Sequence, residues 1–180
     1  MKNLLIIITL LFLGVPSNEE ASVTWNETTK LTWSDFKASP DLKSGAVAVT
    51  ASGITFGYSV KTSDERIVDF STTVQAHFYP NKSWYVKEKG NAYILAHEQL
   101  HFDITELYAR KFRAQITKLI VNQNVKEQMK RLHATINEAV NETQKRYDEQ
   151  TKHSMNREMQ KQWEVTIQNE LSKYEDFKSL

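Results

Sequence analysis

The chain has 180 residues, and its 23 lysines and arginines nearly balance its 22 aspartates and glutamates, so the formal net charge is only +1. This charge provides no basic excess for binding nucleic acid. Hydrophobic residues make up 40% of the chain, and it contains only 5 glycines and 3 prolines, a composition that argues against disorder and for one folded domain. Because cysteine is absent, disulfides, cysteine-ligated metals and thiol nucleophiles are excluded.

Residues 1–17 have the pattern of a secretory signal peptide. Lys2 precedes an apolar stretch from Leu4 to Leu13, and a Gly-Val-Pro-Ser segment ending at Ser17 follows it. A membrane-spanning helix needs about 20 apolar residues, so this stretch is too short to be one. We expect cleavage near Ser17 and export to the bacterial periplasm or the medium, with no membrane insertion of the mature residues 18–180. An uncleaved anchor or a buried N-terminal helix is the alternative.

The N-terminal half of the mature chain predicts strands. From Val68 to Phe78, apolar residues occupy most even positions and polar residues the odd ones, which is the pattern of a half-buried strand. The stretch from Ile54 to Val60 repeats this period of two. We expect a meander of about four strands, with Trp25 and Trp33 on the first two.

The C-terminal half predicts three helices. Asn91 can cap a helix that contains neither Pro nor Gly and extends to about Asn122. Two further apolar stripes at helical spacing follow, one from Met129 to Tyr147 and one from Met159 to Tyr174. The sequence therefore predicts an α+β domain in which a mainly antiparallel sheet packs against a long helix and two further helices.

A single pentapeptide in the first long helix indicates chemistry. Residues 97–101 read His-Glu-Gln-Leu-His, the HExxH pattern. Two histidines four residues apart lie about 40° apart around a helix, so both rings can bind one metal ion. Glu98 lies on the neighbouring strip of the helix, where its carboxylate can take a proton from a metal-bound water. The pattern predicts a site for one zinc ion, with His97 and His101 as ligands and Glu98 as general base.

A catalytic zinc site also needs a third protein ligand. Glu106 projects about 180° away from His97 on a continuous helix, and Asp103 points away from both histidines. Ile104 and Leu107 replace the glycine and histidine of the extended metzincin pattern. A downstream glutamate of the thermolysin type could be Glu127 or Glu138, but we expect both to be solvated, since each falls about 200° from the apolar stripe of the second helix.

The other three histidines differ in their expected surroundings. His77 falls on the polar face of its strand, and His133 flanks the stripe of the second helix, so both are expected to be ordinary surface or hydrogen-bonded residues. His153 lies in a short polar break between two helices. Its position alone is compatible both with an exposed loop residue and with a ligand directed at the first helix.

Four segments of the chain resemble one bacterial protein family. They are Leu31–Lys37, Ala76–Trp84, the helical stretch His97–Glu106, and Tyr147–Ser154 with Gln160 and Trp163 after it. Together they are similar to a family of predicted secreted zinc-dependent proteases known as domain of unknown function 922. The resemblance implies a zincin-like fold over about residues 24–167, and it implies that His153 is the third zinc ligand.

The hypothesis of a zincin-like fold also suggests roles for one strand and two further residues. In such sites a strand beside the active-site helix can pair with an extended substrate, and the strand Val68–Tyr79 is the candidate. Tyr147 is a candidate for stabilising the tetrahedral oxygen, although as the last member of its stripe it can equally belong to the core. Asp103 is a candidate acceptor for the N–H group of a ligand histidine.

Two functions of different class follow from these patterns. The first is a periplasmic or secreted zinc metalloendopeptidase in which His97, His101 and His153 hold one zinc and Glu98 activates water for hydrolysis of a peptide or protein substrate. The second is a binding or structural protein of the cell envelope that keeps the same scaffold without catalysis. The sequence does not set the oligomeric state.

Overall fold

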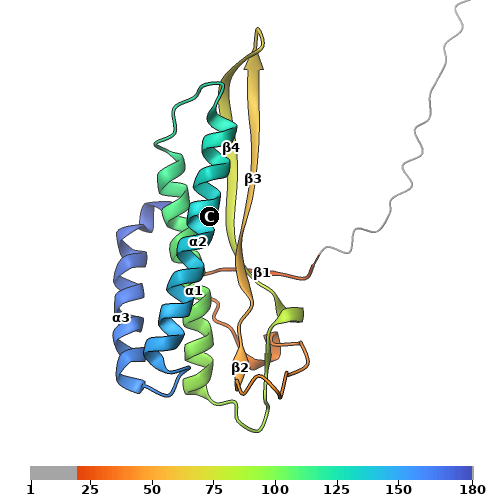
Figure 1. Ribbon diagram of the computed structural model, residues 1–180, viewed down its shortest axis with the longest axis vertical. Coiled ribbons are helices and arrows are strands. Elements are labelled where there is room, and N and C mark those ends of the chain that lie inside the picture. The colour runs from red at the N-terminus through yellow and green to blue at the C-terminus, as the bar shows by residue number, and fades with distance from the viewer. Residues whose placement is uncertain (1–19, 180) are drawn as a thin grey trace, which may run out of the picture.

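The computed structural model describes residues 20–179, so the expected signal peptide lies outside the described residues. The chain forms a long β-hairpin beside three helices that lie side by side (Figure 1). The strands are β1 (Val23–Thr24), β2 (Ala48–Val49), β3 (Ser52–Ser63), β4 (Arg66–Phe78) and β5 (Trp84–Tyr85), and the helices are α1 (Ala92–Ile116), α2 (Val125–Thr151) and α3 (Arg157–Lys173). The predicted α+β class with an antiparallel sheet and three helices is confirmed.

The β3–β4 hairpin follows the period-two pattern of the sequence. Its strands are antiparallel and pair Phe56 with Val74 and Gly57 with Thr73. The even positions of both strands share the face that packs on the helices, and Val74, Ala76 and Phe78 are buried there. Val68 is exposed although it fits the alternation of the sequence, because the pairing with β3 skips it where the register shifts between Lys61 and Thr62. The strand pattern therefore holds up to this irregularity near the hairpin tip.

The predicted four-stranded meander is wrong in its first half. The described strands form a three-stranded sheet in the order β1-β4-β3 and a separate pair of β2 with β5. Trp25 directly follows β1, but Trp33 begins a single 3-10 turn over Trp33–Asp35. The carboxylate of Asp35 accepts the backbone N–H of Thr32 at 2.7 Å, a local bond that competes with strand pairing.

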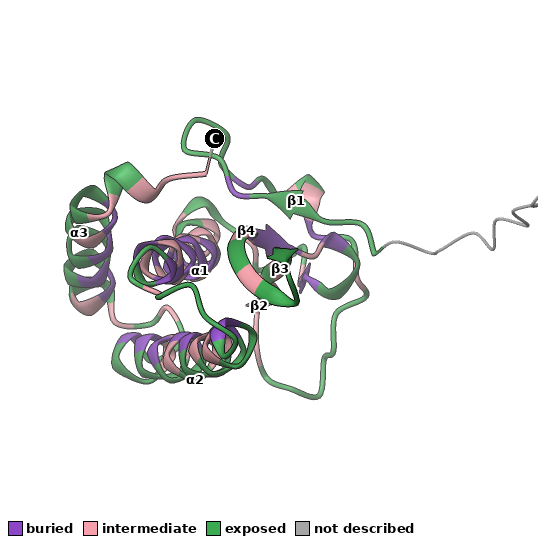
Figure 2. Ribbon diagram, turned by 90° about the horizontal axis from the view of Figure 1, so that it is seen from above, coloured by how far each residue is buried: buried purple, intermediate pink, exposed green. Residues whose placement is uncertain are grey.

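Helix α1 begins as predicted but ends earlier than Asn122. The side chain of Asn91 accepts the backbone N–H groups of Tyr93 and Ile94, which caps the first turn. The helix ends at Ile116, and α1 lies between the hairpin on one side and α2 and α3 on the other (Figure 2). Buried residues accordingly occur around most of its circumference rather than along one stripe.

Two apolar clusters meet at α1. Phe102, Ala109 and Phe112 pack against the sheet together with Phe78 and Trp25. On the opposite side, α1 packs against apolar residues of α2 and α3, in a cluster formed by Leu100, Ile104, Leu107, Val140, Tyr147, Trp163, Ile167 and Leu171. The HExxH motif is therefore held by a helix that is fixed on both sides.

A buried ion network fixes the C-terminal end of the chain to α1. Glu106 is fully buried and accepts hydrogen bonds from Arg110 at 3.0 Å and from Arg113 at 3.1 Å. Arg113 also donates to the carbonyl of Phe177, and Arg110 to that of Leu171. Within residues 20–179, none of the helices has both the length and the apolar character needed to cross a membrane.

Candidate metal centre

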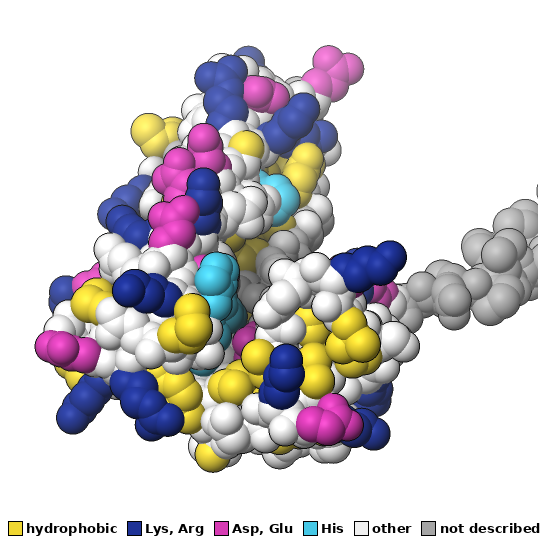
Figure 3. All heavy atoms as spheres, turned by 60° about the horizontal axis from the view of Figure 1, so that its bottom comes forward, with side chains coloured by type: hydrophobic (Ala, Val, Ile, Leu, Met, Phe, Trp, Pro, Cys, Tyr) yellow, Lys and Arg dark blue, Asp and Glu magenta, His cyan; other side chains and the backbone are white. Residues whose placement is uncertain are grey.

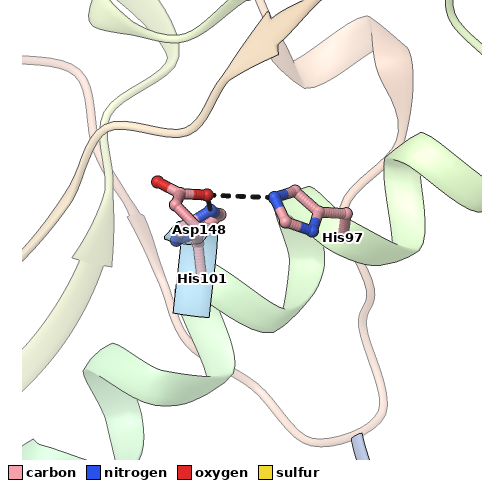
Figure 4. Close-up of side chains that lie close together, drawn as sticks. All are labelled: His97, His101 and Asp148. Carbon is pink, nitrogen blue, oxygen red and sulfur yellow. Dashed lines mark hydrogen bonds and ion pairs between the residues drawn. The ribbon is translucent and has the colours of Figure 1, made fainter. Parts of the chain in front are cut away.

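The two histidines of HExxH face α2 and meet a single carboxylate there. Asp148 Oδ1 lies 3.2 Å from His97 Nε2 and 3.1 Å from His101 Nε2 (Figure 4). The two histidine side chains are 4% and 12% exposed. One ligand atom from each of His97, His101 and Asp148 lies within 4.8 Å of the other two, so the three residues could hold a metal ion.

Asp148 is the site residue that the sequence analysis missed. It lies in the last turn of α2 and follows Tyr147, the final residue of the apolar stripe. Gln144 lies one turn earlier on the same side of α2 and also contacts the site. The available signal was therefore a pair of polar residues at a spacing of four, directly beside the stripe that packs on α1.

The Nδ1 atom of each histidine has a glutamine side chain as its hydrogen-bond partner. His97 Nδ1 lies 3.2 Å from Gln160 Oε1, and His101 Nδ1 makes a short contact with Gln144 Oε1. The amide nitrogen of Gln144 donates to the carbonyl of His101 at 2.8 Å, and that of Gln160 donates to Glu164 at 3.2 Å. These bonds fix the amide oxygens toward the rings, so each imidazole donates from Nδ1 and directs Nε2 at Asp148.

This arrangement concentrates electron pairs at one point. A neutral imidazole that donates from Nδ1 has only an acceptor lone pair at Nε2. Two such lone pairs then face the same carboxylate oxygen, Asp148 Oδ1. Three acceptors in contact repel one another unless protons or a cation lie between them, and a divalent cation satisfies all three at once.

Without a metal ion, protons can take the place of the cation between the histidines and Asp148. Burial opposes the charged form of His101, but its hydrogen bond to Asp148 and the charge of Glu98 outweigh burial and hold the pKa of His101 above its ordinary value. Burial likewise disfavours the charged form of Asp148, but the hydrogen bonds from His101 and His97 outweigh it and hold the pKa of Asp148 well below its usual range. The site thus retains a carboxylate and attracts positive charge.

The distances from Asp148 Oδ1 to the two histidine nitrogens also suit a tetrahedral ion. Ligand atoms at about 2.0 Å from a zinc ion, in tetrahedral directions, are about 3.3 Å apart. The two measured nitrogen-to-oxygen distances are 3.2 and 3.1 Å. Two imidazoles and one carboxylate form the ligand set of many catalytic zinc sites, so the residues present fit the metal that HExxH predicts.

The cluster opens into a cleft of about 780 Å³ at one end of the helices. Figure 3 looks at this end and shows histidine side chains along the wall of the hollow. Glu98 lines the cleft and is only 4% exposed. Among residues 20–179 its carboxylate has no hydrogen-bond partner. The neighbouring side chains of Tyr147, Asp148 and both histidines, in contrast, are all hydrogen-bonded. Glu98 is therefore free to accept a proton from a molecule in the cleft.

The strand beside the cleft is β2 rather than β4. The expected candidate, Val68–Tyr79, covers most of β4 and the residue after it, and the end of β4 is paired with β3 on one side and β1 on the other. Residues 44–50 line the cleft instead, and the hydroxyl of Thr50 donates to the carbonyl of Glu98 at 3.2 Å. The carbonyl of Val47 accepts from the N–H of Val86, the residue after β5. Because the direction of the backbone hydrogen bonds alternates along an antiparallel strand, the N–H and C=O of the next residue, Ala48, point away from β5.

His153 lies at the edge of the cleft and outside the tight cluster. Its Nδ1 is 3.7 Å from Asp148 Oδ1, and its side chain is 76% exposed. Lys152, His153 and Ser154 all have positive φ angles, between 49° and 68°, in the turn that joins α2 to α3. Three consecutive residues other than glycine in the left-handed region form a strained turn. The structure therefore brings His153 near the proposed ligands without placing it among them.

Tyr147 lies beneath the histidines. Its ring stacks on that of His97 with centroids 4.5 Å apart, and its hydroxyl donates to the carbonyl of His97 at 3.4 Å. Burial is the largest cause that raises the pKa of Tyr147 above its ordinary value. The side chain is fully buried, so in this structure it supports the ring of His97 and does not reach the cleft.

The remaining sequence candidates lie away from the cluster. The carboxylate of Asp103 accepts from Trp25 at 2.7 Å and from Gln99 at 2.8 Å, so it is not bonded to a ligand histidine. Glu127 and Glu138 are exposed, as expected. His77 is buried and hydrogen-bonded to Thr55, which agrees with the expectation of a hydrogen-bonded residue, and His133 stacks on Phe112.

Comparison with known proteins gives a family without a function. Residues 23–154 match the family described as "Bacterial protein of unknown function (DUF922)". The chain belongs to this family. The matched region contains His97, His101, Asp148 and His153, whereas α3 lies beyond it. Neither the curated proteins nor the solved structures contain a match.

Proposed function

We propose that this DUF922 protein is an exported zinc-dependent metallopeptidase that holds one zinc ion through His97, His101 and Asp148. The observation that carries the proposal is the convergence of two Nε2 atoms and one carboxylate oxygen at 3.1 and 3.2 Å, beside a cleft. Two imidazoles and a carboxylate leave a fourth tetrahedral position for water or substrate, as catalytic zinc sites do.

In this proposal the side chains of the cleft have separate roles. A bound zinc ion would lower the pKa of water and polarise the scissile carbonyl. The carboxylate of Glu98 accepts a proton from the attacking water and returns it to the leaving amine. Gln144 and Gln160 hold the imidazoles in the tautomer that directs Nε2 at the ion.

The cleft suits an extended peptide. Ala48 lies on the wall opposite the HExxH helix, and its backbone groups point away from β5. A substrate backbone can bond to these groups as an added strand. The mostly apolar side chains of residues 46–49 and Ile94 give the substrate side chains an apolar environment. We therefore propose unstructured peptide or protein segments as substrates.

The decisive experiment separates metal binding from chemistry. Glu98→Gln should abolish hydrolysis of a denatured protein substrate while the zinc content stays near one ion per chain. The matched control is Glu138→Gln, an exposed residue of α2 that should keep full activity. Retained turnover in Glu98→Gln would exclude the proposed mechanism.

His153 supports a second candidate function, a closed and non-catalytic metal site. Its Nδ1 is 3.7 Å from Asp148 Oδ1, so a change of the strained turn that carries it could add a fourth ligand. Four protein ligands are typical of structural zinc sites. If the site is closed in this way, wild type is inactive and His153→Ala keeps its zinc, because three ligands remain. If His153 is instead the third ligand, His153→Ala loses zinc.

A further inference from the structure

The hairpin has an open edge far from the metal centre. Among the described residues, β3 pairs only with β4, whereas the end of β4 also pairs with β1. Tyr79 N–H donates to Ala51 O, and Trp25 N–H donates to Ala76 O. Since the bonding direction alternates along an antiparallel strand, the backbone groups of the even residues from Ile54 to Val60 point away from β4.

This edge has few of the features that block strand addition. Natural sheets protect exposed edges with proline, charged side chains, bulges or covering segments. Strand β3 contains no proline, its only charged residue is Lys61, and its pairing irregularity occurs only between Lys61 and Thr62. The stretch Thr55–Val60 therefore presents unprotected hydrogen-bonding groups to solvent.

A groove lies beside this edge. Phe56 and Tyr58 of β3 form one wall of a hollow of about 430 Å³, and the beginning of α2 forms the other. The wall contributed by α2 and the residues before it comprises Gln123, Asn124, Lys126, Glu127, Lys130 and His133. A free strand edge next to a helix is the geometry in which a domain binds an extended peptide as an additional strand.

The side chains of the groove define the chemistry of its occupant. Phe56 and Tyr58 stack with centroids 5.6 Å apart on the face that an added strand would share. β-branched side chains pair well with aromatic neighbours across strands. Lys126 and Lys130 have no ion-pair partner among residues 20–179, whereas Glu127 is paired with Arg131 at 3.0 Å. The groove therefore presents an apolar wall and an unbalanced positive charge.

We propose that the edge of β3 and the groove beside it bind an extended acidic segment of a partner protein by strand addition. Backbone bonds to Phe56 and Tyr58 align the segment, β-branched side chains pack on the two rings, and carboxylates face Lys126 and Lys130. Lys130 and Asp148 are 18 residues apart on α2, which at 1.5 Å per residue is about 27 Å. The surface is thus separate from the metal centre, and its function does not depend on catalysis.

The test uses labelled peptides and the full chain. The probe has nine residues, in which every second residue is threonine and the others are alternately valine and glutamate. We expect saturable binding by fluorescence anisotropy, with affinity about tenfold weaker for Lys126→Glu with Lys130→Glu. The matched control, Lys145→Glu with Lys161→Glu, changes the net charge equally on exposed positions outside the groove and should bind like wild type.

Two further comparisons separate strand addition from general attraction of charge. A probe methylated on alternate backbone nitrogens, or one with lysine in place of glutamate, should not bind. In hydrogen exchange, the intact probe should protect the outward amides of Phe56 and Tyr58. The proposal is overturned if the intact probe does not bind at 1 mM, if the methylated probe binds equally, or if both lysine pairs weaken binding to the same extent.

Discussion

Zinc should stabilise this protein by joining α1 to α2. The proposed ligands come from both helices, and Asp148 follows His101 by 47 residues, so the unfolded chain does not hold the three groups together. A ligand that binds only the folded state at 100 times its Kd adds about 2.7 kcal/mol to the free energy of unfolding. For a domain of this size, 1 kcal/mol shifts Tm by about 2–4 °C. The predicted increase in Tm is therefore about 5–11 °C.

The assay is thermal unfolding of the mature chain, first dialysed against a chelator and then titrated with zinc. His101→Ala should lose the shift, since it removes one ligand, and Glu98→Gln should keep it. His133→Ala, which removes a histidine at the other end of α2, is the matched control and should also keep the shift. An equal increase in Tm for wild type and His101→Ala would refute the reasoning, because the stabilising ion would then bind elsewhere.

Three further predictions concern the same helices. Glu106→Gln should lower the free energy of unfolding by about 3–5 kcal/mol in urea, because it removes the buried carboxylate that pairs with both Arg110 and Arg113 and leaves Arg110 with only the half-exposed Glu175. Zinc affinity, measured by competition with a chelator, should fall with decreasing pH, and the fall should begin above pH 6.5, since the pKa of His101 is raised and a ligand imidazole must be neutral. Tyr147→Phe should cost about 1 kcal/mol of stability and leave kcat nearly unchanged, because the hydroxyl bonds to His97 O; a fall of 100-fold in kcat would instead assign it the oxyanion role.

The part of the site that follows from local spacing was predictable from the sequence. His97, Glu98 and His101 lie within two turns of one helix, and a helix fixes the relative directions of such residues. The capping of that helix by Asn91 is equally local and is confirmed. The same geometry correctly separated Glu106, which is buried in an ion network with arginines, from the metal cluster.

The part that depends on how helices pack was not predictable. Asp148 and Gln144 come from α2 and Gln160 from α3, and their approach to the histidines depends on the rotation of both helices about their axes. A stripe such as Met129–Tyr147 indicates which face is buried but not which residue of α1 each position meets. The family resemblance therefore implied His153, in the turn between those helices, as a ligand, while no pattern in the sequence indicated Asp148.

The strands beside the cleft were missed for a different reason. β2 has two residues and pairs with β5, which also has two, so neither produces a period-two pattern long enough to recognise. β4 has 13 residues and gives the strongest alternation in the chain, but its pairing with β1 and β3 leaves no free edge near α1. Long strands are therefore easiest to predict, and here the short one borders the site.

The most direct test of the account is the zinc content of the purified chain, measured by mass spectrometry of the metal beside the variants Asp148→Ala and His153→Ala. The account predicts one zinc ion per chain in wild type and in His153→Ala, and almost none in Asp148→Ala. Full occupancy in Asp148→Ala together with loss in His153→Ala would contradict the ligand set, and the absence of zinc from wild type after exposure to it would contradict the metal centre.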